Sequence, residues 1–178
     1  MKRFKFDFEH ASRGDGARAS VRIRESTSRS VSLVRHFPAK GDTMPAIEST
    51  YIMIKPDAVR DRKIGEIITR IERSGLTVER MEMGVLDSEV VKEHYAHLAD
   101  KPFFGDLVAF MTSGPVVKMV VTGLGAIGKM RTLMGATNPL DAAPGTIRGD
   151  FAVDVNSNVI HGSDGPETAE IEIKRFFG

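Results

Sequence analysis

The stretch TYIMIKP, residues 50–56, is the apolar run around which the fold can be assembled. Tyr51, Ile52, Met53 and Ile54 follow one another with no polar residue between them, and Pro56 closes the run. A continuous apolar segment this short, ended by proline, is typical of a strand buried inside a sheet. The sequence therefore predicts a buried strand here, with the remaining regular structure following it.

The two segments after this strand have contrasting hydrophobic periods. Apolar residues at Ile64, Ile67, Ile68 and Ile71 have helical spacing, and Gly75 supplies a helix stop. The following residues, 76–86, alternate between apolar and polar side chains, as a half-buried strand does. A helix and a second strand are expected.

The rest of the chain continues this alternation of helices and strands. The expected elements are helices at 87–100 and 103–111, a strand at 115–123, a helix at 125–135, an irregular loop at 136–150, a strand at 158–161 and a helix at 166–177. The underlying order is β-α-β-β-α-β with helical insertions. It predicts an α/β (α+β) protein of the ferredoxin-like plan, a mainly antiparallel four-stranded sheet covered on one face by helices.

The composition is that of an ordinary globular protein. The chain has 178 residues, of which 28% are charged and 41% hydrophobic, enough for one domain with its own core. A net charge of +1 indicates neither a nucleic acid nor a membrane surface as partner. The chain contains no cysteine, which excludes disulfides, thiolate catalysis and cysteine-bound metals and fits a cytoplasmic location. No apolar run approaches the roughly 18 residues of a membrane span.

Residues 1–43 differ from the rest of the chain. They carry a net charge of +5, which leaves −4 for residues 44–178. They are polar, without sustained periodicity or the apolar core of a secretory signal, and too acidic for a transit peptide. We predict a disordered leader followed by a domain at 44–178. An alternative interpretation is a start codon assigned too early, because Met44 directly precedes the regular pattern.

A histidine near the end of the chain is the main candidate for chemistry. In NVIHGSDGPE, residues 158–167, His161 lies where a strand ends, and Pro166 suits the first turn of the next helix, with Ser163 or Asp164 as a cap. A helix start offers N–H groups to an anion. Acidic residues of that helix could orient the imidazole: Glu167, Glu170 and Glu172. The pattern indicates a nucleophile or base beside an anion.

The long loop at 136–150 supplies a second candidate. Loops of this length inside a compact domain are generally functional. Arg131 precedes the loop, Thr137 and Asn138 open it and Arg148 lies near its end. Two arginines and a hydroxyl could hold a phosphate chain. A solvated surface loop with ordinary charges is the alternative.

Two further motifs are weaker candidates for a binding site. GLGAIGKM, residues 123–130, nearly matches the phosphate-binding P-loop, but Met130 replaces the hydroxyl that contacts Mg²⁺, and the expected sheet is not parallel. His94 and His97 have the i, i+3 spacing of a metal-binding pair, yet such a pair is more often a solvated helix face, and no third ligand is evident.

Seven short segments, in this order, resemble the nucleoside diphosphate kinase family: YIMIKPDAV, KEHY, KPFF, SGPVV, LMGATNP, PGTIRGDF and NVIHGSD. The resemblance extends from about residue 50 to residue 177 and leaves the first 43 residues uncovered. It implies the ferredoxin-like fold reached above, and it makes the loop at 136–150 the family's characteristic loop.

The resemblance also implies a two-step, ping-pong reaction. His161 would take the γ-phosphate of a nucleoside triphosphate as phosphohistidine and pass it to a different nucleoside diphosphate. The residues implied for catalysis are His161, Glu172, Lys55 and Tyr95, with Ser163 close to the histidine. Those implied for nucleotide binding are Lys55, Phe103, Leu107, Arg131, Thr137, Arg148, Val155 and Asn158.

Within that set, Arg131, Thr137 and Arg148 would bind the phosphates. Lys55 and Asn158 would contact the ribose, and Lys55 would also face the phosphate. The base would stack on Phe103 with Leu107 and Val155 beside it, which implies low base specificity, although an aromatic in a helix is more often a core residue. Mg²⁺ would be held mainly by the nucleotide and water, without a dedicated protein site.

The family resemblance has two departures. Ala58 stands where many members have glycine, a small change, and the chain ends at Gly178, soon after the last helix. Because C-terminal extensions make subunit contacts in the family, assembly is the open point, and we expect a homo-oligomer, a hexamer in preference to a tetramer. Two alternatives fit the sequence less well. A non-catalytic member would lack the histidine or its support, and an RNA-binding module would need an aromatic-rich strand and a basic face, which this sequence lacks.

Overall fold

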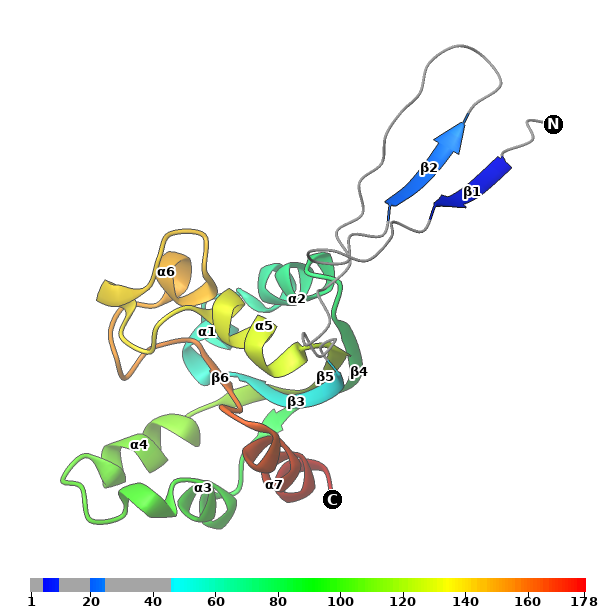
Figure 1. Cartoon of the computed structure of the whole chain (residues 1–178). Helices are drawn as coiled ribbons and strands as arrows, with labels where there is room; N and C mark the ends of the chain where they lie inside the picture. The colour runs from blue at the N-terminus through cyan, green and yellow to red at the C-terminus, as the bar shows by residue number, and fades with distance from the viewer. Residues whose placement is uncertain (1–4, 10–19, 25–45) are drawn as a thin grey trace. The chain divides into compact units, whose positions relative to one another are not determined.

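The computed structural model describes residues 5–9, 20–24 and 46–178 (Figure 1). The chain divides into two compact units, Met1–Pro45 and Ala46–Gly178. In the first unit, β1 (Lys5–Glu9) pairs antiparallel with β2 (Ser20–Arg24). These strands differ from the leader without regular structure that the sequence analysis expected. Each has an alternating apolar pattern, but only over five residues. The rest of the predicted leader lies outside the described residues.

The second unit is built on a four-stranded sheet. Its strands are β3 (Ile47–Ile54), β4 (Thr77–Val85), β5 (Pro115–Leu124) and β6 (Ile160–Gly162), in the spatial order β4-β5-β3-β6. All three neighbouring pairs are antiparallel. The last strand of the chain therefore lies beside the first strand of this unit, and the predicted ferredoxin-like fold is confirmed.

β3 is buried on both of its faces. Tyr51, Ile52, Met53 and Ile54 have no exposed surface. Because successive side chains of a strand point to opposite faces, Ile52 and Ile54 enter one core cluster and Tyr51 and Met53 enter another. The expectation of helices on one face only was wrong, since helices cover both faces of the sheet (Figure 1).

One face is covered by the helices that follow β3 and β5. The cluster around Ile52 and Ile54 includes Ile67 and Ile71, which are one helical turn apart. The helices of this layer are α1 (Pro56–Arg60), α2 (Ile64–Arg73), α5 (Ala126–Met134) and α6 (Ile147–Phe151). This layer also carries the long loop, with its 3₁₀ turn at Pro139–Asp141.

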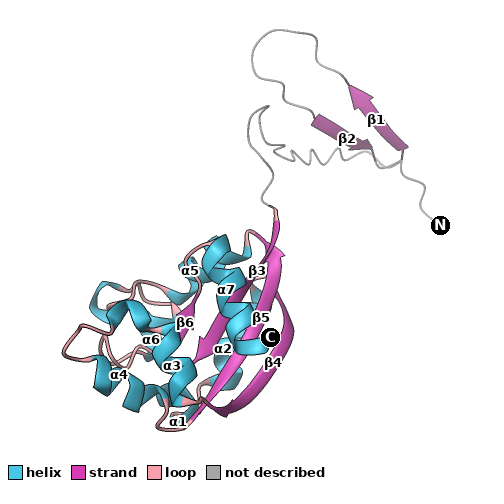
Figure 2. Ribbon diagram, turned by 90° about the horizontal axis from the view of Figure 1, so that it is seen from below, coloured by secondary structure: helices cyan, strands magenta, loops and turns pink. Residues whose placement is uncertain are grey.

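The other face is covered by α3 (Ser88–His94), α4 (Phe104–Met111) and α7 (Pro166–Phe177), with a 3₁₀ turn at Ala96–Leu98 (Figure 2). Val91, Met111 and Phe176 pack with Tyr51 and Met53 of β3. The inserted helices between β4 and β5 thus form, together with the C-terminal helix, the second layer.

Local rules explain where two of the shorter helices begin. Pro56 was interpreted as the end of a strand, and it is also the first residue of α1, a position that proline favours because its missing N–H needs no partner there. The Thr146 side chain accepts a hydrogen bond from the Gly149 N–H and caps α6 inside the loop that the sequence analysis expected to be irregular. None of the helices in the described part of the chain is both long enough and apolar enough to cross a bilayer.

Candidate active site

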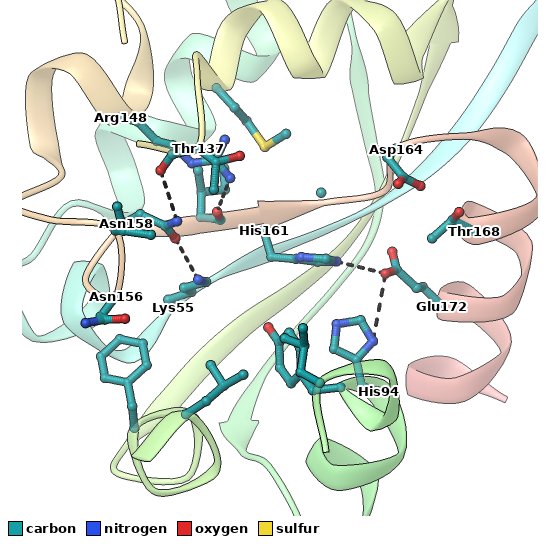
Figure 3. Close-up of a pocket in the computed structure, with 18 of the residues that line it drawn as sticks. Lys55, His94, Thr137, Arg148, Asn156, Asn158, His161, Asp164, Thr168 and Glu172 are labelled. Atoms are coloured by element: carbon teal, nitrogen blue, oxygen red, sulfur yellow. Dashed lines mark hydrogen bonds and ion pairs between the residues drawn. The ribbon is translucent and has the colours of Figure 1, made fainter. Parts of the chain in front are cut away.

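A cavity of about 910 Å³ lies beside β6 (Figure 3). β6 contributes His161, which lies opposite Met53 of β3. All the predicted site residues line this one cavity: Lys55, Tyr95, Phe103, Leu107, Arg131, Thr137, Arg148, Val155, Asn158, His161 and Glu172. They lie on or directly beside α3, α4, α5, α6 and α7, at the ends of β3 and β6, in the long loop, and in the loop between α6 and β6. The fold therefore brings together residues far apart in sequence.

His161 is held by a carboxylate. Its Nε2 lies 2.9 Å from Oε1 of Glu172, and Oε2 of the same carboxylate accepts a 2.6 Å hydrogen bond from Oγ of Ser163. Ser163 is tied to β3 in turn, since its backbone N–H donates to the Tyr51 carbonyl. The ring orientation of His161 is therefore set through Glu172 and Ser163 by the sheet.

The carboxylate of Glu172 is buried and ionised. Burial alone would raise the pKa of Glu172, but hydrogen bonding to His161 and Ser163 outweighs it and holds the pKa below its usual value. A charged carboxylate prefers an N–H donor at Nε2 of His161. The lone pair of the neutral imidazole is then on Nδ1.

A second histidine lies against this pair. His94, the last residue of α3, is 8% exposed, and its ring is 4.9 Å from that of His161 at an angle of 87°. Its Nδ1 is 3.8 Å from Oε1 of Glu172. Burial and the neighbouring His161 lower the pKa of His94 to about 3, so this imidazole is neutral. Neither of its nitrogens has a hydrogen-bond partner among the described residues.

Lys55 and Asn158 form a buried polar pair across the β3–β6 boundary. The Lys55 ammonium donates a 2.6 Å hydrogen bond to the Asn158 side-chain oxygen, and the Asn158 amide donates to the Thr137 carbonyl. Burial lowers the pKa of Lys55 to about 8, against the opposing effect of Asp57 and with the help of Arg148. Lys55 therefore carries a desolvated positive charge near neutral pH.

Arg148 connects the long loop to the sheet. Its guanidinium donates to the carbonyls of Gly135 and Ile160, each at 2.8 Å, while its buried Nε has no partner in the described structure. Burial and the nearby Arg131 lower the pKa of Arg148 to about 10, which leaves it charged at neutral pH. Arg131 and Thr137 are exposed at the cavity wall.

The outer wall of the cavity is apolar and exposed. Phe103, which directly precedes α4, is 47% exposed, and Val155 on the opposite loop is 52% exposed. Leu107 lies one turn further along α4. The alternative in which Phe103 is an ordinary core aromatic does not apply, because half of its surface is free.

Tyr95 lies at the end of α3 and packs edge-on against His94, with ring centroids 4.4 Å apart. Burial, together with the charge of Glu172, raises the pKa of the Tyr95 phenol well above its usual value. The phenol is therefore neutral and retains its O–H as a donor to the cavity.

The backbone just before His161 is strained. Val159 has φ 60°, a left-handed conformation that is unfavourable for a β-branched residue. Its N–H donates to the Asp57 carboxylate at 3.1 Å, and its carbonyl accepts from the Lys55 N–H at 2.9 Å. The turn between β3 and α1 thus holds the strained peptide that leads into His161.

Comparison with known proteins identifies the family to which this site belongs. The model of the family described as nucleoside diphosphate kinase matches residues 48–178. The chain belongs to the nucleoside diphosphate kinase family. Two similar family members are the enzymes named nucleoside diphosphate kinase from Streptococcus thermophilus, 55% identical over 136 residues, and from Methanosarcina barkeri, 56% identical over 131 residues. Each alignment covers 74% of this chain, and 99% and 88% of the respective relatives.

Solved structures of nucleoside diphosphate kinases have the same fold. The enzyme from Encephalitozoon cuniculi aligns with a TM-score of 0.72 at 47% identity, over 74% of this chain and 89% of its own. The Halobacterium salinarum enzyme, described in complex with CDP, aligns with a TM-score of 0.72 at 49% identity, over 74% and 88%.

Two parts of this nucleoside diphosphate kinase site were missed from the sequence. His94 was interpreted as half of an exposed pair with His97, but α3 turns it inward to Glu172, and the apolar Val91 one turn earlier was the signal for that inward face. Asp164 and Thr168 also line the cavity near the start of α7 (Figure 3). Asp164 was considered only as a helix cap. A hydrogen bond from Thr168 lowers the pKa of Asp164, which keeps it ionised.

Proposed function

We propose that this chain transfers the γ-phosphate of a nucleoside triphosphate to a nucleoside diphosphate by a ping-pong route through a phosphohistidine at His161. The observation that carries the proposal is the bond between Nε2 of His161 and the buried carboxylate of Glu172, which leaves Nδ1 as the nitrogen for attack. Membership of the nucleoside diphosphate kinase family supports the same reaction.

In the first step, the lone pair of His161 Nδ1 forms an N–P bond with the γ-phosphorus. The bond from that phosphorus to the bridging oxygen breaks, and the departing diphosphate keeps the electron pair. The histidine ring gains a positive charge, and its Nε2–H faces the Glu172 carboxylate. No proton needs to be removed from the nucleophile. The second step reverses these bond changes with a different diphosphate.

The cationic residues of the cavity bind the phosphates. Lys55 and Arg148 are buried donors whose position is set by Asn158 and by backbone carbonyls, so little rearrangement is needed when the anion arrives. The Nε of Arg148 has no partner among the described residues, which supports a contact between Arg148 and a ligand. Exposed Arg131 and Thr137 add charge and a hydroxyl, and the Tyr95 phenol donates to the transferred group.

Mg²⁺ is the expected metal cofactor of this reaction. It prefers oxygen ligands and keeps several waters, which fits a cavity lined by the ionised carboxylate of Asp164. Asp164 would hold the ion through water, while the nucleotide supplies the direct ligands. When bound, the ion neutralises charge on the phosphate oxygens.

The nucleoside lies along the apolar wall. The base stacks on Phe103 beside Leu107 and Val155, and the ribose hydroxyls join the hydrogen bond between Lys55 and Asn158. A stacked base presents a face that all bases share, so base specificity is low.

Phosphoenzyme formation tests the proposal. Incubation with γ-labelled ATP is expected to give a covalent phosphoprotein that is stable in base and labile in acid. His161→Ala should form none and retain less than about one percent of turnover, with nucleotide binding largely kept because the other contacts remain. His97→Ala is the matched control and should behave as the parent. Full turnover by His161→Ala would contradict the phosphohistidine route.

We further propose a homo-oligomer, a hexamer in preference to a tetramer, located in the cytoplasm, with residues 44–178 as the enzymatic domain. Among the described strands, β4 pairs only with β5, and its outer residues Met81, Met83 and Val85 are all more than half exposed. An apolar edge strand of this kind is a surface for subunit contact. Native mass measurement should give about 117 kDa for six copies of the 19.5 kDa chain, whereas a mass near 78 kDa would indicate the tetramer.

A further inference from the structure

Three possible metal ligands converge at the inner end of the cavity. One ligand atom from each of His94, His161 and Glu172 lies within 4.8 Å of the other two. The three residues come from α3, β6 and α7, which are separate elements of the fold. All three line the cavity, so an ion can enter by the route that a nucleotide would take (Figure 3).

His94 is the unexplained member of this group. It is more than nine-tenths buried, and both of its ring nitrogens lack a hydrogen-bond partner in the described structure. An unsatisfied buried nitrogen destabilises the fold, and a metal ion bonded to that nitrogen would offset the loss. The phosphoryl transfer described above does not use His94.

Two of the three distances between ligand atoms are close to those around a tetrahedral ion. Bonds of about 2.0–2.1 Å to zinc place the ligand atoms about 3.3 Å apart. Nε2 of His161 is 2.9 Å from Oε1 of Glu172, and Nδ1 of His94 is 3.8 Å from the same oxygen. Shifts of about half an ångström or less would bring these two pairs to that spacing. The ligand atoms of the two histidines lie within 4.8 Å of each other, and a water would complete the coordination.

We propose that His94, His161 and Glu172 form a binding site for Zn²⁺, or a divalent transition-metal ion of similar preference, which switches off the nucleophile. Two imidazoles and one carboxylate are a known ligand set for zinc. Mg²⁺ prefers oxygen ligands and an octahedral shell, so it would not compete at two nitrogens.

The ion would act by moving a proton on His161. Coordination of zinc by the Nε2 lone pair requires the proton of the neutral ring to be on Nδ1. The lone pair that attacks phosphorus is then occupied, and no phosphohistidine forms. This inhibitory part rests on the proposed function, whereas binding of the ion does not.

Zinc binding is measured first, without nucleotide. The full chain in a Mg²⁺-containing buffer is titrated with ZnCl₂ by calorimetry. The variant His10→Ala/His36→Ala/His97→Ala serves as background because it removes every histidine outside the proposed set. One zinc ion should bind per chain. Adding His94→Asn to this background should weaken zinc binding by more than about tenfold. Removing a group that only supports a metal ligand already costs at least that much affinity.

Matched controls separate ligand loss from misfolding. Glu172→Gln should also weaken binding, whereas Glu167→Gln, an exposed acid on the same helix, should not. Thermal melting without metal checks that each variant folds, and His94→Gln replaces His94→Asn if the latter does not. Absence of stoichiometric binding, or equal zinc affinity with and without His94, would overturn the site.

Inhibition is measured second. Protein loaded with zinc and separated from free metal should form phosphoenzyme from labelled ATP at less than about a tenth of the rate of metal-free protein, and EDTA should restore the rate. Zinc bound at His94 without any effect on phosphoenzyme formation would overturn the inhibitory role. If metal-free protein forms no phosphoenzyme, the proposed function fails instead, and the binding result stands by itself.

Discussion

Lys55 is a buried cation of the cavity, and its burial is expected to make the activity of the protein sensitive to pH. Burial lowers the pKa of Lys55 to about 8, so the ammonium loses its proton as the pH rises through that value. Loss of the positive charge weakens the attraction for phosphate. We predict that kcat/KM, which reports on the free enzyme, falls as the pH rises above about 8.

Lys55→Arg tests this assignment, because a guanidinium keeps its charge throughout the range. The variant should lose activity overall through altered geometry, but its kcat/KM should no longer fall near pH 8. Lys101→Arg, at an exposed lysine, should keep the parent profile. A parent profile that is flat from pH 7 to 9 would show that Lys55 does not titrate as inferred.

The residues that line the cavity could largely be recognised from the sequence, because short motifs carry them. The helix after His161 offered three carboxylates, and spacing alone did not choose among them. The structure selects Glu172 because only that acid is buried against the ring, whereas Glu167 and Glu170 are exposed. His94 was misread, because an i, i+3 spacing with His97 does not say which histidine faces the core.

At the scale of elements, the turn from β3 into α1 holds the strained backbone that precedes β6. The Asp57 carboxylate accepts the N–H of strained Val159, and a left-handed β-branched residue costs about 1–3 kcal/mol. We predict that Asp57→Ala lowers the free energy of unfolding by about 1–3 kcal/mol, since a buried N–H is left unpaired. Asp57→Asn keeps an acceptor oxygen and should lose less.

Urea unfolding of both variants measures this effect. Asp61→Ala, at an exposed aspartate just beyond α1, is the control and should change stability by no more than about 0.5 kcal/mol. Equal stabilities for Asp57→Ala and the parent would show that Asp57 does not stabilise the segment that leads into β6.

The apolar wall formed by α4 and the loop around Val155 leads to a prediction about substrates. Stacking on Phe103 discriminates weakly, by about 1–3 kcal/mol among bases, so purine and pyrimidine diphosphates should differ in kcat/KM by no more than roughly a hundredfold. Diphosphates without a 3′-hydroxyl should be much poorer than their 2′-deoxy counterparts, because Lys55 and Asn158 lose a polar partner.

A panel of four ribonucleotides, their 2′-deoxy forms and one 2′,3′-dideoxy form measures both effects. Phe103→Ala should raise KM for every base to a similar degree, while Leu140→Ala, exposed on the same surface loop as Thr137, should leave KM unchanged. Strong selection for one base would indicate a site that reads base edges. If the dideoxy substrate were equally good, Lys55 and Asn158 would not be the residues that bind the ribose hydroxyls.

Helices and strands with a clear period were predicted well, and the short ones were not. The isoleucine pattern of α2 and the alternation of β4 agree with the structure to within two residues at each end. α1 and α6 have five residues each, too few for a period to be visible. The sequence did not show that the inserted helices cover the second face of the sheet. Tyr51 and Met53 are buried against that face, but a continuous apolar run does not say which elements cover each side of a strand.

At the scale of the whole molecule, the enzymatic domain is expected to be independent of the leader. The family match begins at residue 48, and the core clusters formed by the described residues contain residues from Tyr51 onward. We predict that a chain beginning at Met44 has the same turnover as the full chain and melts within about 2 °C of it, because it keeps every residue of both described core clusters. Thermal melting and a coupled kinase assay compare the two proteins. A large decrease in either would make the leader part of the working domain.

The double burial of β3 has a consequence for motion. Its N–H groups bond to β5 on one side and to β6 on the other, and helices cover both of its faces. Deuterium should therefore enter the amides of Ile52 and Ile54 only when the whole domain unfolds, whereas the three-residue strand β6 can open locally. Hydrogen-exchange mass spectrometry should find β3 the slowest peptide of the domain, and nucleotide should slow exchange in β6 without altering β3. His161 would then lie on a strand that opens locally, next to a strand that opens only when the domain unfolds.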